Sequence, residues 1–552
     1  MAQSGICGDN LTWKLEDGTL TISGEGEIPY YSSTPWYTYA SSIKHVILEP
    51  GVTSIRSSAF YYYTDLTSVI IPQSVTNIGA YAFYGCINLE SVTIPESLSS
   101  IEAYTFAFCF KLTSITIPDG VTDIGTSAFG NCTSLSSSII IPKSVTNIGA
   151  YAFGGCQSLP SIIVEFGNTN YSSSNGVLFS KDYTTLISYP AGKLENSYLI
   201  PESVTNIEEN AFYYCRLTTV TIPEGVTDIG TSAFHNCLNL NSITIPKSTT
   251  NIGAYVFGGC ESLTSIIVEI GNTNYSSSNG VLFSKDYTTL ISYPAGKLEN
   301  SYLIPESVVN ISSSAFTNNQ KLTSIVIPEG VTNIGSSAFF YCSFTSITIP
   351  ESITNIGAYA FGHCEKLTSI VIPKNVTSIE ELTFAGCISL TSASIPESVT
   401  SIGEKAFLSC TSLKNIYVAI KEPISVGAYA FDFVDKSTCI LHVPTGSEEA
   451  YRKAEVWKEF YNIVGEDFSS IGNETLSNNI DFRYNAATQE IVVSGIENGA
   501  SISLFDMNGK LLQSVLVQEN QPTSVEYLPN GAIYIAKIQK QGEISTFRFL
   551  KQ

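Results

Sequence analysis

A unit of about 23 residues repeats along most of this sequence, and it constrains the fold more than any other feature. One copy, residues 112–132, reads Leu-Thr-Ser-Ile-Thr-Ile-Pro-Asp-Gly-Val-Thr-Asp-Ile-Gly-Thr-Ser-Ala-Phe-Gly-Asn-Cys. One unit buries too few apolar side chains to offset the entropy lost in ordering its backbone, so each must stack on the next. The repeat therefore predicts a solenoid over residues 43–444. Its anchoring prolines, at steps of 22 to 24 residues with two steps of 59, are Pro50, Pro72, Pro95, Pro118, Pro142, Pro201, Pro223, Pro246, Pro305, Pro328, Pro350, Pro373 and Pro396.

Within the unit, a short strand is followed by a compact turn. Ile115 and Ile117 alternate with polar residues, which is the period of a half-buried strand, and the proline that follows cannot donate to a ladder. The spacing of Ala128, Phe129 and Cys132 favours a single helical or 3-10 turn that closes the coil. We therefore expect a repeat solenoid of parallel β-strands joined by short helical or 3-10 turns.

The two long steps contain a unit of a different kind. Residues 176–192 hold two apolar runs around a turn at Ser180-Lys-Asp-Tyr183. They predict a β-hairpin that projects from an otherwise regular coil, near residues 162–200 and again near 266–304. Residues 161–204 and 265–308 differ at a single position, which indicates a duplicated block.

Both ends of the array need a cap, because a terminal coil exposes apolar surface and an unpaired strand edge. Residues 1–42 lack the repeat, and Leu11–Leu15 and Leu20–Ser23 are typical of a β-hairpin cap. Thr445-Gly-Ser-Glu448 resembles a capping box that opens a helix to about Phe460, so residues 445–464 are expected to form a helical cap. The aromatic residues expected to cover the first coil are Trp13, Tyr30, Tyr31, Trp36, Tyr37 and Tyr39.

Short strands of a different spacing fill the C-terminal part. The dipeptides Asn508-Gly509 and Asn530-Gly531 are typical of hairpin turns. We expect a polar linker over residues 465–480 and a small antiparallel β-sandwich over residues 481–552. The predicted strands are Ile491–Ser494, Ser501–Phe505, Lys510–Gln513, Ser524–Tyr527, Ile533–Ala536 and Thr546–Leu550.

The charge balance limits the classes of partner. The chain has 27 Lys and Arg against 49 Asp and Glu, a net charge of −22, which repels nucleic-acid phosphates and anionic lipid. The sequence contains no apolar run long enough to predict a transmembrane segment. Its N-terminus shows no signal peptide, so we expect either a cytosolic protein or a mature form whose export signal has been removed.

Cysteine is frequent and regularly placed. Neighbouring thiols at one register of stacked coils point the same way, which disfavours disulfides, and no short-spaced ligand cluster predicts a metal site. We therefore expect buried free thiols that act as small apolar groups. Cys7 and Cys439 lie outside this register. The register contains Cys86, Cys109, Cys132, Cys156, Cys215, Cys237, Cys260, Cys342, Cys364, Cys387 and Cys410.

No catalytic arrangement is evident. The histidines His45, His235, His363 and His442 lie in different coils without a recurring carboxylate or nucleophile. The common nucleotide-binding, hydrolase, metalloprotease and calcium-binding motifs are absent from the sequence. We expect a protein that is not an enzyme, with no catalytic, cofactor-binding or metal-binding residues.

The residue between the two inward positions of each strand should face outward. These residues are mainly threonine and aliphatic, which either reflects β-propensity alone or provides a broad surface for protein or glycan. The tyrosine of the recurrent Gly-Ala-Tyr-Ala-Phe either forms an aromatic stripe or packs on the neighbouring coil. The candidate binding face consists of Thr93, Thr116, Thr221, Thr244, Val326, Thr348, Val371 and Ser394.

The unit L-x-S-I-x-I-P-x-x-V-x-x-I-x-x-x-A-F-x-x-C resembles the BspA-like leucine-rich repeat of bacterial surface proteins. The opening Cys7-Gly-Asp-Asn-Leu-Thr-Trp13, the segment Asn175-Gly-Val-Leu-Phe179 and His442-Val-Pro-Thr-Gly-Ser447 extend the resemblance over residues 5–464. The resemblance implies a leucine-rich-repeat solenoid at the cell surface. It also implies adhesion to host matrix proteins or to other bacteria, without defining ligand residues.

The C-terminal part is similar to the sorting domain of the type IX secretion system of Bacteroidetes. The matching pieces are Leu504-Phe-Asp-Met-Asn-Gly-Lys510, Leu528-Pro-Asn-Gly531 and Phe549-Leu-Lys-Gln552, with one extra residue between Gly531 and Tyr534 relative to the usual pattern. This resemblance implies export across the outer membrane, with residues 481–552 contacting the export machinery.

We therefore expect a non-enzymatic cell-surface or secreted protein. Its expected partners are host extracellular-matrix or mucosal proteins and glycans, or other bacterial surfaces. The alternative is a structural spacer or surface-layer component without a specific ligand. An enzyme built on the hairpins would require a pocket with convergent polar groups.

Overall fold

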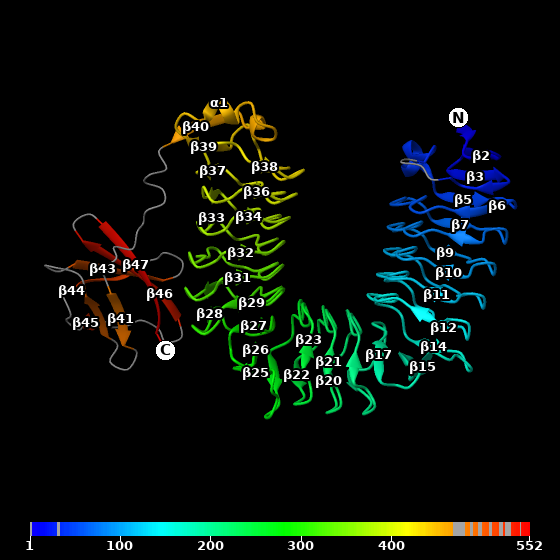
Figure 1. Ribbon diagram of the computed structural model, residues 1–552, viewed down its shortest axis with the longest axis horizontal. Helices are drawn as coiled ribbons and strands as arrows, with labels where there is room; N and C mark the ends of the chain where they lie inside the picture. The colour runs from blue at the N-terminus through cyan, green and yellow to red at the C-terminus, as the bar shows by residue number, and fades with distance from the viewer. Residues whose placement is uncertain are drawn as a thin grey trace. The chain divides into compact units, whose positions relative to one another are not determined.

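The computed structural model confirms the predicted solenoid of stacked coils. It describes residues 3–29 and 34–466, and the strand segments 481–485, 490–494, 500–506, 511–517, 523–524, 532–540 and 543–551. The chain divides into two compact units, Met1–Asp286 with Ser292–Gly296 and Tyr287–Ile291 with Lys297–Gln552. Within each unit, successive coils stack and place one short strand on each of two sides (Figure 1).

In the first unit, equivalent residues of successive coils pair in parallel register, as in the row Ile101, Ile124 and Ile148. Strands on the Ile-Pro side are β5 (His45–Leu48), β7 (Ser68–Ile70), β9 (Ser91–Val92), β12 (Ile139–Ile141), β14 (Ile162–Val164), β18 (Ser197–Leu199), β20 (Thr219–Thr221), β22 (Ser242–Ile245) and β24 (Ser265–Val268). Strands on the second side are β4 (Gly26–Glu27), β6 (Val52–Ile55), β8 (Asn77–Ile78), β10 (Ser100–Ile101), β11 (Asp123–Ile124), β13 (Asn147–Ile148), β19 (Asn206–Ile207), β21 (Asp228–Ile229) and β23 (Asn251–Ile252).

The second unit repeats this pattern. Strands on its Ile-Pro side are β28 (Ser301–Leu303), β30 (Ser324–Val326), β33 (Ser369–Val371), β35 (Ser392–Ile395), β37 (Asn415–Val418), β39 (Ile440–Pro444) and β40 (Asn462–Glu466). Strands on its second side are β29 (Asn310–Ile311), β31 (Asn333–Ile334), β32 (Asn355–Ile356), β34 (Ser378–Ile379), β36 (Ser401–Ile402) and β38 (Ser425–Val426).

The strand expected at Ile115–Ile117 is not formed as a ladder, although its alternation is correct. Ile115 and Ile117 are buried and Thr116 is exposed, but this segment contains no strand. The Thr113 amide donates to the Glu90 carbonyl of the preceding coil at 3.3 Å. The alternation of apolar and polar residues therefore decides which side chains point inward, even where no continuous hydrogen-bonded ladder forms.

The turns that close the coils are not helical or 3-10, which corrects the prediction. In the coil of Cys132, the Gly130 amide donates back to Ser127 at 3.0 Å, whereas the Phe129 amide donates to Ala152 of the next coil at 2.9 Å. Ser127 and Asn131 have φ of 52° and 60°. Because these left-handed residues turn alternate amides toward the neighbouring coil, half of the amides close the turn and the other half join it to the next turn.

The core is a column of aromatic rings flanked by thiols. In the first unit, Phe83, Phe106 and Phe129 stack with centroids 5.5 and 5.7 Å apart and planes within 6°. In the second unit, the Phe361, Phe384 and Phe407 rings stack at 5.6 and 5.2 Å. Offset stacking of this kind adds to the free energy gained by burying the rings.

The predicted hairpin is built into the sheet, rather than projecting from a regular coil. Strands β15 (Tyr171–Ser174), β16 (Val177–Ser180) and β17 (Thr185–Ser188) are antiparallel, and β17 then pairs in parallel with β19. The hairpin thus takes the place of a coil's second-side strand. The duplicated block contains β25 (Tyr275–Ser278), β26 (Val281–Ser284) and β27 (Thr289–Ser292).

Antiparallel strands β1 (Gln3–Ile6), β2 (Leu11–Glu16) and β3 (Thr19–Gly24) precede the first coil, and β3 pairs in parallel with β5. Buried Trp36, just before the 3-10 helix Tyr37–Ser42, stacks on Phe60 with centroids 6.1 Å apart. Tyr37 is exposed and Tyr39 packs against the core, while Tyr30 and Tyr31 lie outside the described residues.

The helix predicted from Thr445 to about Phe460 is much shorter. Helix α1 spans only Glu448–Tyr451, and a 3-10 helix follows at Trp457–Glu459. Ser447 makes no side-chain capping bond, and Val456 has φ of 67°, which interrupts a helix. Buried Tyr451 and Trp457 hold the segment instead, donating to the carbonyls of Ile420 and Ile424 at 2.8 and 3.1 Å.

The C-terminal part contains two antiparallel sheets, in the orders β41-β42-β45 and β44-β43-β46-β47. Their packing into a sandwich stays a prediction. The predicted Asn-Gly turns and the linker residues 467–480 lie outside the described residues. The strands are β41 (Asp481–Asn485), β42 (Glu490–Ser494), β43 (Ala500–Asp506), β44 (Leu511–Val517), β45 (Thr523–Ser524), β46 (Ala532–Lys540) and β47 (Glu543–Lys551).

Candidate functional site

In the first unit, the predicted binding face lies on the Ile-Pro side. Thr93, Thr116, Thr221 and Thr244 are all exposed there. Thr221 lies beside Leu199 in the ladder of β18 and β20, and Thr244 lies beside Ile267 in the ladder of β22 and β24. The side chains therefore form a strip of exposed hydroxyl and methyl groups along these ladders.

In the second unit, Thr348 and Val371 are exposed, whereas Val326 and Ser394 are half-buried. Val371 and Ser394 lie side by side in the parallel ladder, and Tyr417 and His442 continue the row. The Tyr417 and His442 rings stack with centroids 4.3 Å apart. This aromatic pair extends the predicted strip.

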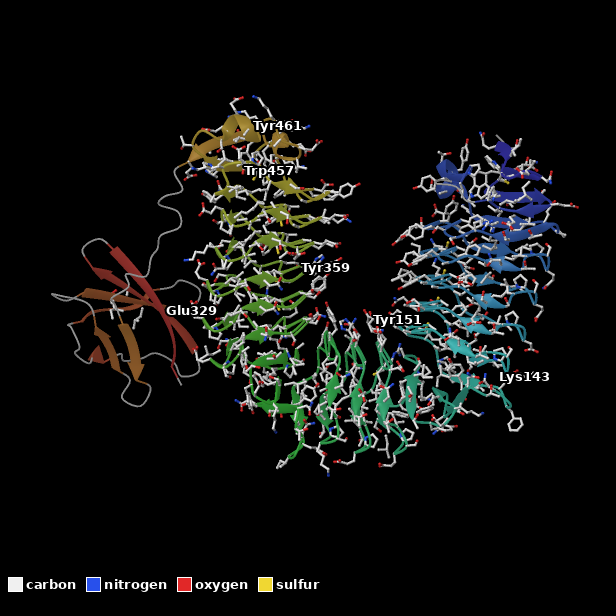
Figure 2. The ribbon with its side chains drawn as sticks, in the orientation of Figure 1. Lys143, Tyr151, Glu329, Tyr359, Trp457 and Tyr461 are labelled. Carbon is white, nitrogen blue, oxygen red and sulfur yellow. The ribbon has the colours of Figure 1, made fainter. Side chains whose placement is uncertain are left out.

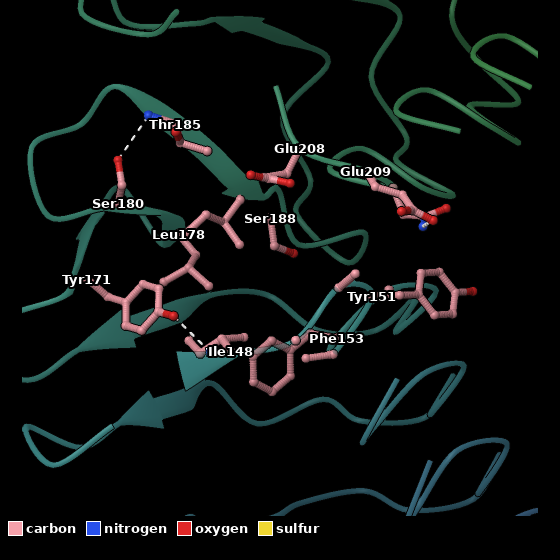
Figure 3. Close-up of a pocket in the computed structure, with 16 residues that line it drawn as sticks. Ile148, Tyr151, Phe153, Tyr171, Leu178, Ser180, Thr185, Ser188, Glu208 and Glu209 are labelled. Carbon is pink, nitrogen blue, oxygen red and sulfur yellow. Dashed lines mark hydrogen bonds between the residues drawn. The ribbon is translucent and has the colours of Figure 1, made fainter. Parts of the chain in front are cut away.

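A pocket of about 290 Å³, which sequence reasoning did not predict, lies within the first unit between the coil of Phe153 and the hairpin strands (Figure 3). Leu178, Phe153 and Ile148 supply its apolar wall, and Glu208 and Ser188 point toward it (Figure 3). The only sequence signal for this pocket is the 59-residue step, in which the hairpin replaces the Ala-Phe-x-x-Cys turn.

Tyr171 connects the hairpin to the coil before it. Its hydroxyl accepts a hydrogen bond from the Ile148 amide at 2.8 Å, in place of a strand carbonyl. Burial raises the pKa of Tyr171, and the carboxylates of Asp123 and Glu208 add a smaller upward effect. The hydroxyl therefore stays protonated at neutral pH and still has a proton to donate.

The carboxylates at the pocket have amide partners but no cation. Asn206 Nδ2 donates to Glu208 at 3.1 Å, and Asn210 Nδ2 donates to Glu209 at 3.2 Å. Among the described residues, no lysine, arginine or histidine forms a salt bridge with either glutamate. This rim can accept hydrogen bonds or bind a cationic group.

The recurrent tyrosines pack on neighbouring coils rather than forming one stripe. The Tyr81 ring stacks on Tyr104 with centroids 4.7 Å apart, and Tyr151 meets Tyr213 edge-on at 5.0 Å. Tyr359 and Tyr151 are drawn in Figure 2. Around Tyr81, stacked aromatic side chains form a local cluster whose remaining members are Tyr61, Tyr62, Tyr84, Tyr104, Phe108 and Phe110.

The cysteines are thiols throughout. All thirteen are buried and free. Burial raises the pKa of Cys86 and of Cys156 to about 12. A thiol so protonated is a poor nucleophile and metal ligand. In the part of the chain that the structure describes, no group of His, Cys, Asp and Glu side chains is placed to hold a metal ion.

One histidine has a carboxylate neighbour. His442 Nδ1 lies 2.6 Å from Glu466, and its Nε2 lies 3.1 Å from the side-chain oxygen of Asn415. Burial lowers the pKa of His235, which lies flat against Tyr213. These contacts fix the rings in place.

A family model described as a BspA type leucine rich repeat region matches six copies, over residues 35–176, 191–295 and 293–414. No curated protein matches the chain. Across the described residues, no helix has the length and apolar character needed to cross a membrane.

Solved structures similar to this chain include three leucine-rich repeat proteins. A leucine-rich repeat protein from Eubacterium ventriosum is 26% identical with a TM-score of 0.47, over 74% of this chain and 95% of that one. A leucine rich cell surface protein from Faecalibacterium prausnitzii is 28% identical with a TM-score of 0.34, over 76% and 94%. A leucine-rich repeat protein from Bacteroides ovatus is 27% identical with a TM-score of 0.32, over 74% and 93%.

Proposed function

Since the chain belongs to the BspA-type leucine-rich repeat family, we propose that it is a non-enzymatic protein of the cell surface or extracellular space that binds other macromolecules. Its partners would be host extracellular-matrix or mucosal proteins and glycans, or other bacterial surfaces. The observation that carries the proposal is the exposed, uncharged strip that includes Thr221 and Thr244. The Faecalibacterium protein is described as a cell surface protein, which is consistent with this location.

The strip suits macromolecular binding because its backbone is already ordered. Ser242–Ile245 and Ser265–Val268 pair residue by residue, so a partner that covers them loses little additional backbone entropy. The strip offers hydroxyl and methyl groups to protein or glycan surfaces. The net charge of −22 disfavours nucleic acid as a partner.

We also propose that residues 481–552 direct export across the outer membrane. The support is the resemblance of this part to a type IX sorting domain, together with the antiparallel pairing of β43, β46 and β47. Removal of these residues should leave the protein inside the cell in a Bacteroidetes host. Unchanged secretion of the truncated protein would contradict the proposal.

The binding function is tested by immobilising the full chain and exposing it to matrix proteins, mucins and bacterial cells. We expect saturable binding of at least one partner that excess soluble chain abolishes. If nothing in the panel binds, the structural spacer is the better account, because the phenylalanine rings of successive regular coils stack within each unit and stiffen the array.

A further inference from the structure

The pocket beside the hairpin has a row of backbone amides without acceptors. In the coil before it, the amides of Ser127, Phe129 and Asn131 donate to the carbonyls of residues 150, 152 and 154 at 3.0, 2.9 and 2.8 Å. The equivalent amides one coil later belong to Tyr151, Phe153 and Gly155. Within the described part of the chain, none of these three amides donates to an acceptor.

The missing acceptors follow from the hairpin, which supplies no turn segment of its own. Tyr189, just after β17, fills only one position of the absent turn. Its amide donates to the Ala211 carbonyl at 2.7 Å, and its ring stacks on Phe212 with centroids 5.3 Å apart. The remaining space is the pocket between residues 149–154 and residues 208–210.

The opposite wall also lacks its usual neighbour. In regular coils, the carbonyl at the register of Ala103 accepts from the preceding coil, as from Tyr81 at 3.1 Å. The equivalent Glu209 carbonyl accepts no backbone hydrogen bond from the described residues. An occupant of the pocket would therefore meet amide donors on one wall and a carbonyl acceptor on the other.

We propose that this pocket binds a segment of a partner polypeptide through backbone hydrogen bonds, with a basic side chain of that segment reaching Glu208. This proposal rests on the proposed binding function, and it assigns the pocket as one place where a partner contacts the chain. A polypeptide is the occupant that the geometry favours, because where one regular coil follows another these same positions pair with the backbone of the next coil, as Ser127 does with Ala150. Unpaired polar groups in a confined site gain more from such pairing than exposed ones do.

The preference of the pocket for a basic side chain in the partner segment comes from the position of Glu208. Most regular coils place glycine at this register, as at Gly125 and Gly149, although Glu102 occupies it in one of them. A Cβ at Gly149 would lie 2.4 Å from the Thr126 amide nitrogen. Glu208 follows the hairpin, where the preceding turn is missing, and its exposed carboxylate points toward the pocket (Figure 3). Lysine or arginine in the partner segment would neutralise this carboxylate.

The test uses the full chain and two synthetic peptides. One has the sequence of residues 147–154, Asn-Ile-Gly-Ala-Tyr-Ala-Phe-Gly, and the other has lysine in place of its glycine corresponding to Gly149. Hydrogen–deuterium exchange resolved to single amides is measured with and without each peptide. In the free chain, we expect the Tyr151 and Phe153 amides to exchange at least tenfold faster than those of Ser127 and Phe129.

The lysine peptide should slow exchange at residues 151–155 and leave residues 127–131 unchanged. E208Q should weaken its binding about fivefold or more at low salt, whereas E102Q, at the same register of a regular coil, should not. S188W, which fills the pocket, should abolish protection while leaving the thermal transition in place. Protection of residues 151–155 equal to that of 127–131 in the free chain, or peptide binding unaffected by S188W, would overturn the proposal.

Failure of this inference is distinguishable from failure of the proposed function. If partners from the panel bind but the peptides protect no amides, the pocket proposal is wrong and the proposed binding function stands. If the lysine peptide protects residues 151–155 but no partner from the panel binds, the pocket proposal is supported and the proposed binding role of the strip is wrong.

Discussion

The thiol of Cys132 donates a hydrogen bond to the backbone carbonyl of Phe106 in the preceding coil, across 3.2 Å. The same contact joins Cys109 to Phe83 and Cys387 to Phe361, at 3.3 and 3.2 Å. A cysteine at this register thus fills a small apolar space and gives a second hydrogen bond to a carbonyl of the preceding turn, since the Phe106 carbonyl already accepts from the Cys109 amide at 3.3 Å. This packing and hydrogen bonding account for the recurrence of the residue.

The thiols should therefore be inaccessible in the native protein. We expect an aromatic disulfide reagent to modify almost none of the thirteen thiols at pH 8, and all of them in guanidinium chloride. The structure would be contradicted if most were disulfide-bonded or titrated freely before unfolding.

Substitution of Phe129 by alanine should interrupt the aromatic column. A buried phenylalanine replaced by alanine costs about 3–5 kcal/mol, and Phe129 stacks on both Phe106 and Phe153. Because long arrays need not unfold in one step, the effect is measured as lost amide protection in residues 121–132. T116A, at an exposed position of the same coil, should change protection by no more than about 0.5 kcal/mol.

Stability should fall at alkaline pH. Burial raises the pKa of Cys86 and of Tyr63 to about 12, from ordinary values of 9.0 and 10.0. The native state therefore keeps protons that the unfolded state releases. The resulting stability is complete below about pH 9 and is lost as pH rises toward 12.

The denaturant midpoint should accordingly drop between pH 8 and pH 11. Y63F removes one of the titrating groups, so its midpoint should drop less over the same range. A midpoint independent of pH in both proteins would show that these groups are not buried as described.

The hydroxyl of Tyr171 should contribute to stability by accepting a hydrogen bond from the Ile148 amide. Y171F leaves the Ile148 amide without its acceptor at 2.8 Å, a loss expected to cost about 1–3 kcal/mol. Exchange of the Ile148 amide should speed up accordingly in Y171F. The matched change Y275F should act instead on Ile252, which makes the same contact at 2.8 Å in the duplicated block. Equal exchange at Ile148 in Y171F and in the unsubstituted protein would show that the Tyr171 hydroxyl does not serve as the acceptor for this amide.

The sequence predicted the inward and outward residues of the coils well, because burial follows directly from alternation. Ile115 and Thr116 took the expected sides even where no strand formed. The turn was mispredicted because positive φ at residues such as Ser127 and Tyr151 is rare outside glycine, and their side chains do not signal it. At Ser127 this conformation directs the amide to the Ala150 carbonyl of the next coil.

The C-terminal helix was predicted too long and the pocket was missed, both for a different reason. The segment after Glu448 has local helix signals, but burial of Trp457 against the last coil overrides them. The pocket is a gap left where a hairpin replaces a turn. Its lining, from Ile148 to Asn210, is brought together only by stacking.

The most direct test of the proposed function compares T221E/T244E with the control T250E across the panel of matrix proteins, mucins and bacterial cells. Thr250 is an exposed threonine in the same coil as Thr244, on the second side. We expect the double variant to lose at least tenfold in affinity for the bound partner, while T250E binds as the unsubstituted chain does. Equal binding by the double variant, or loss of binding in T250E, would contradict the proposed function.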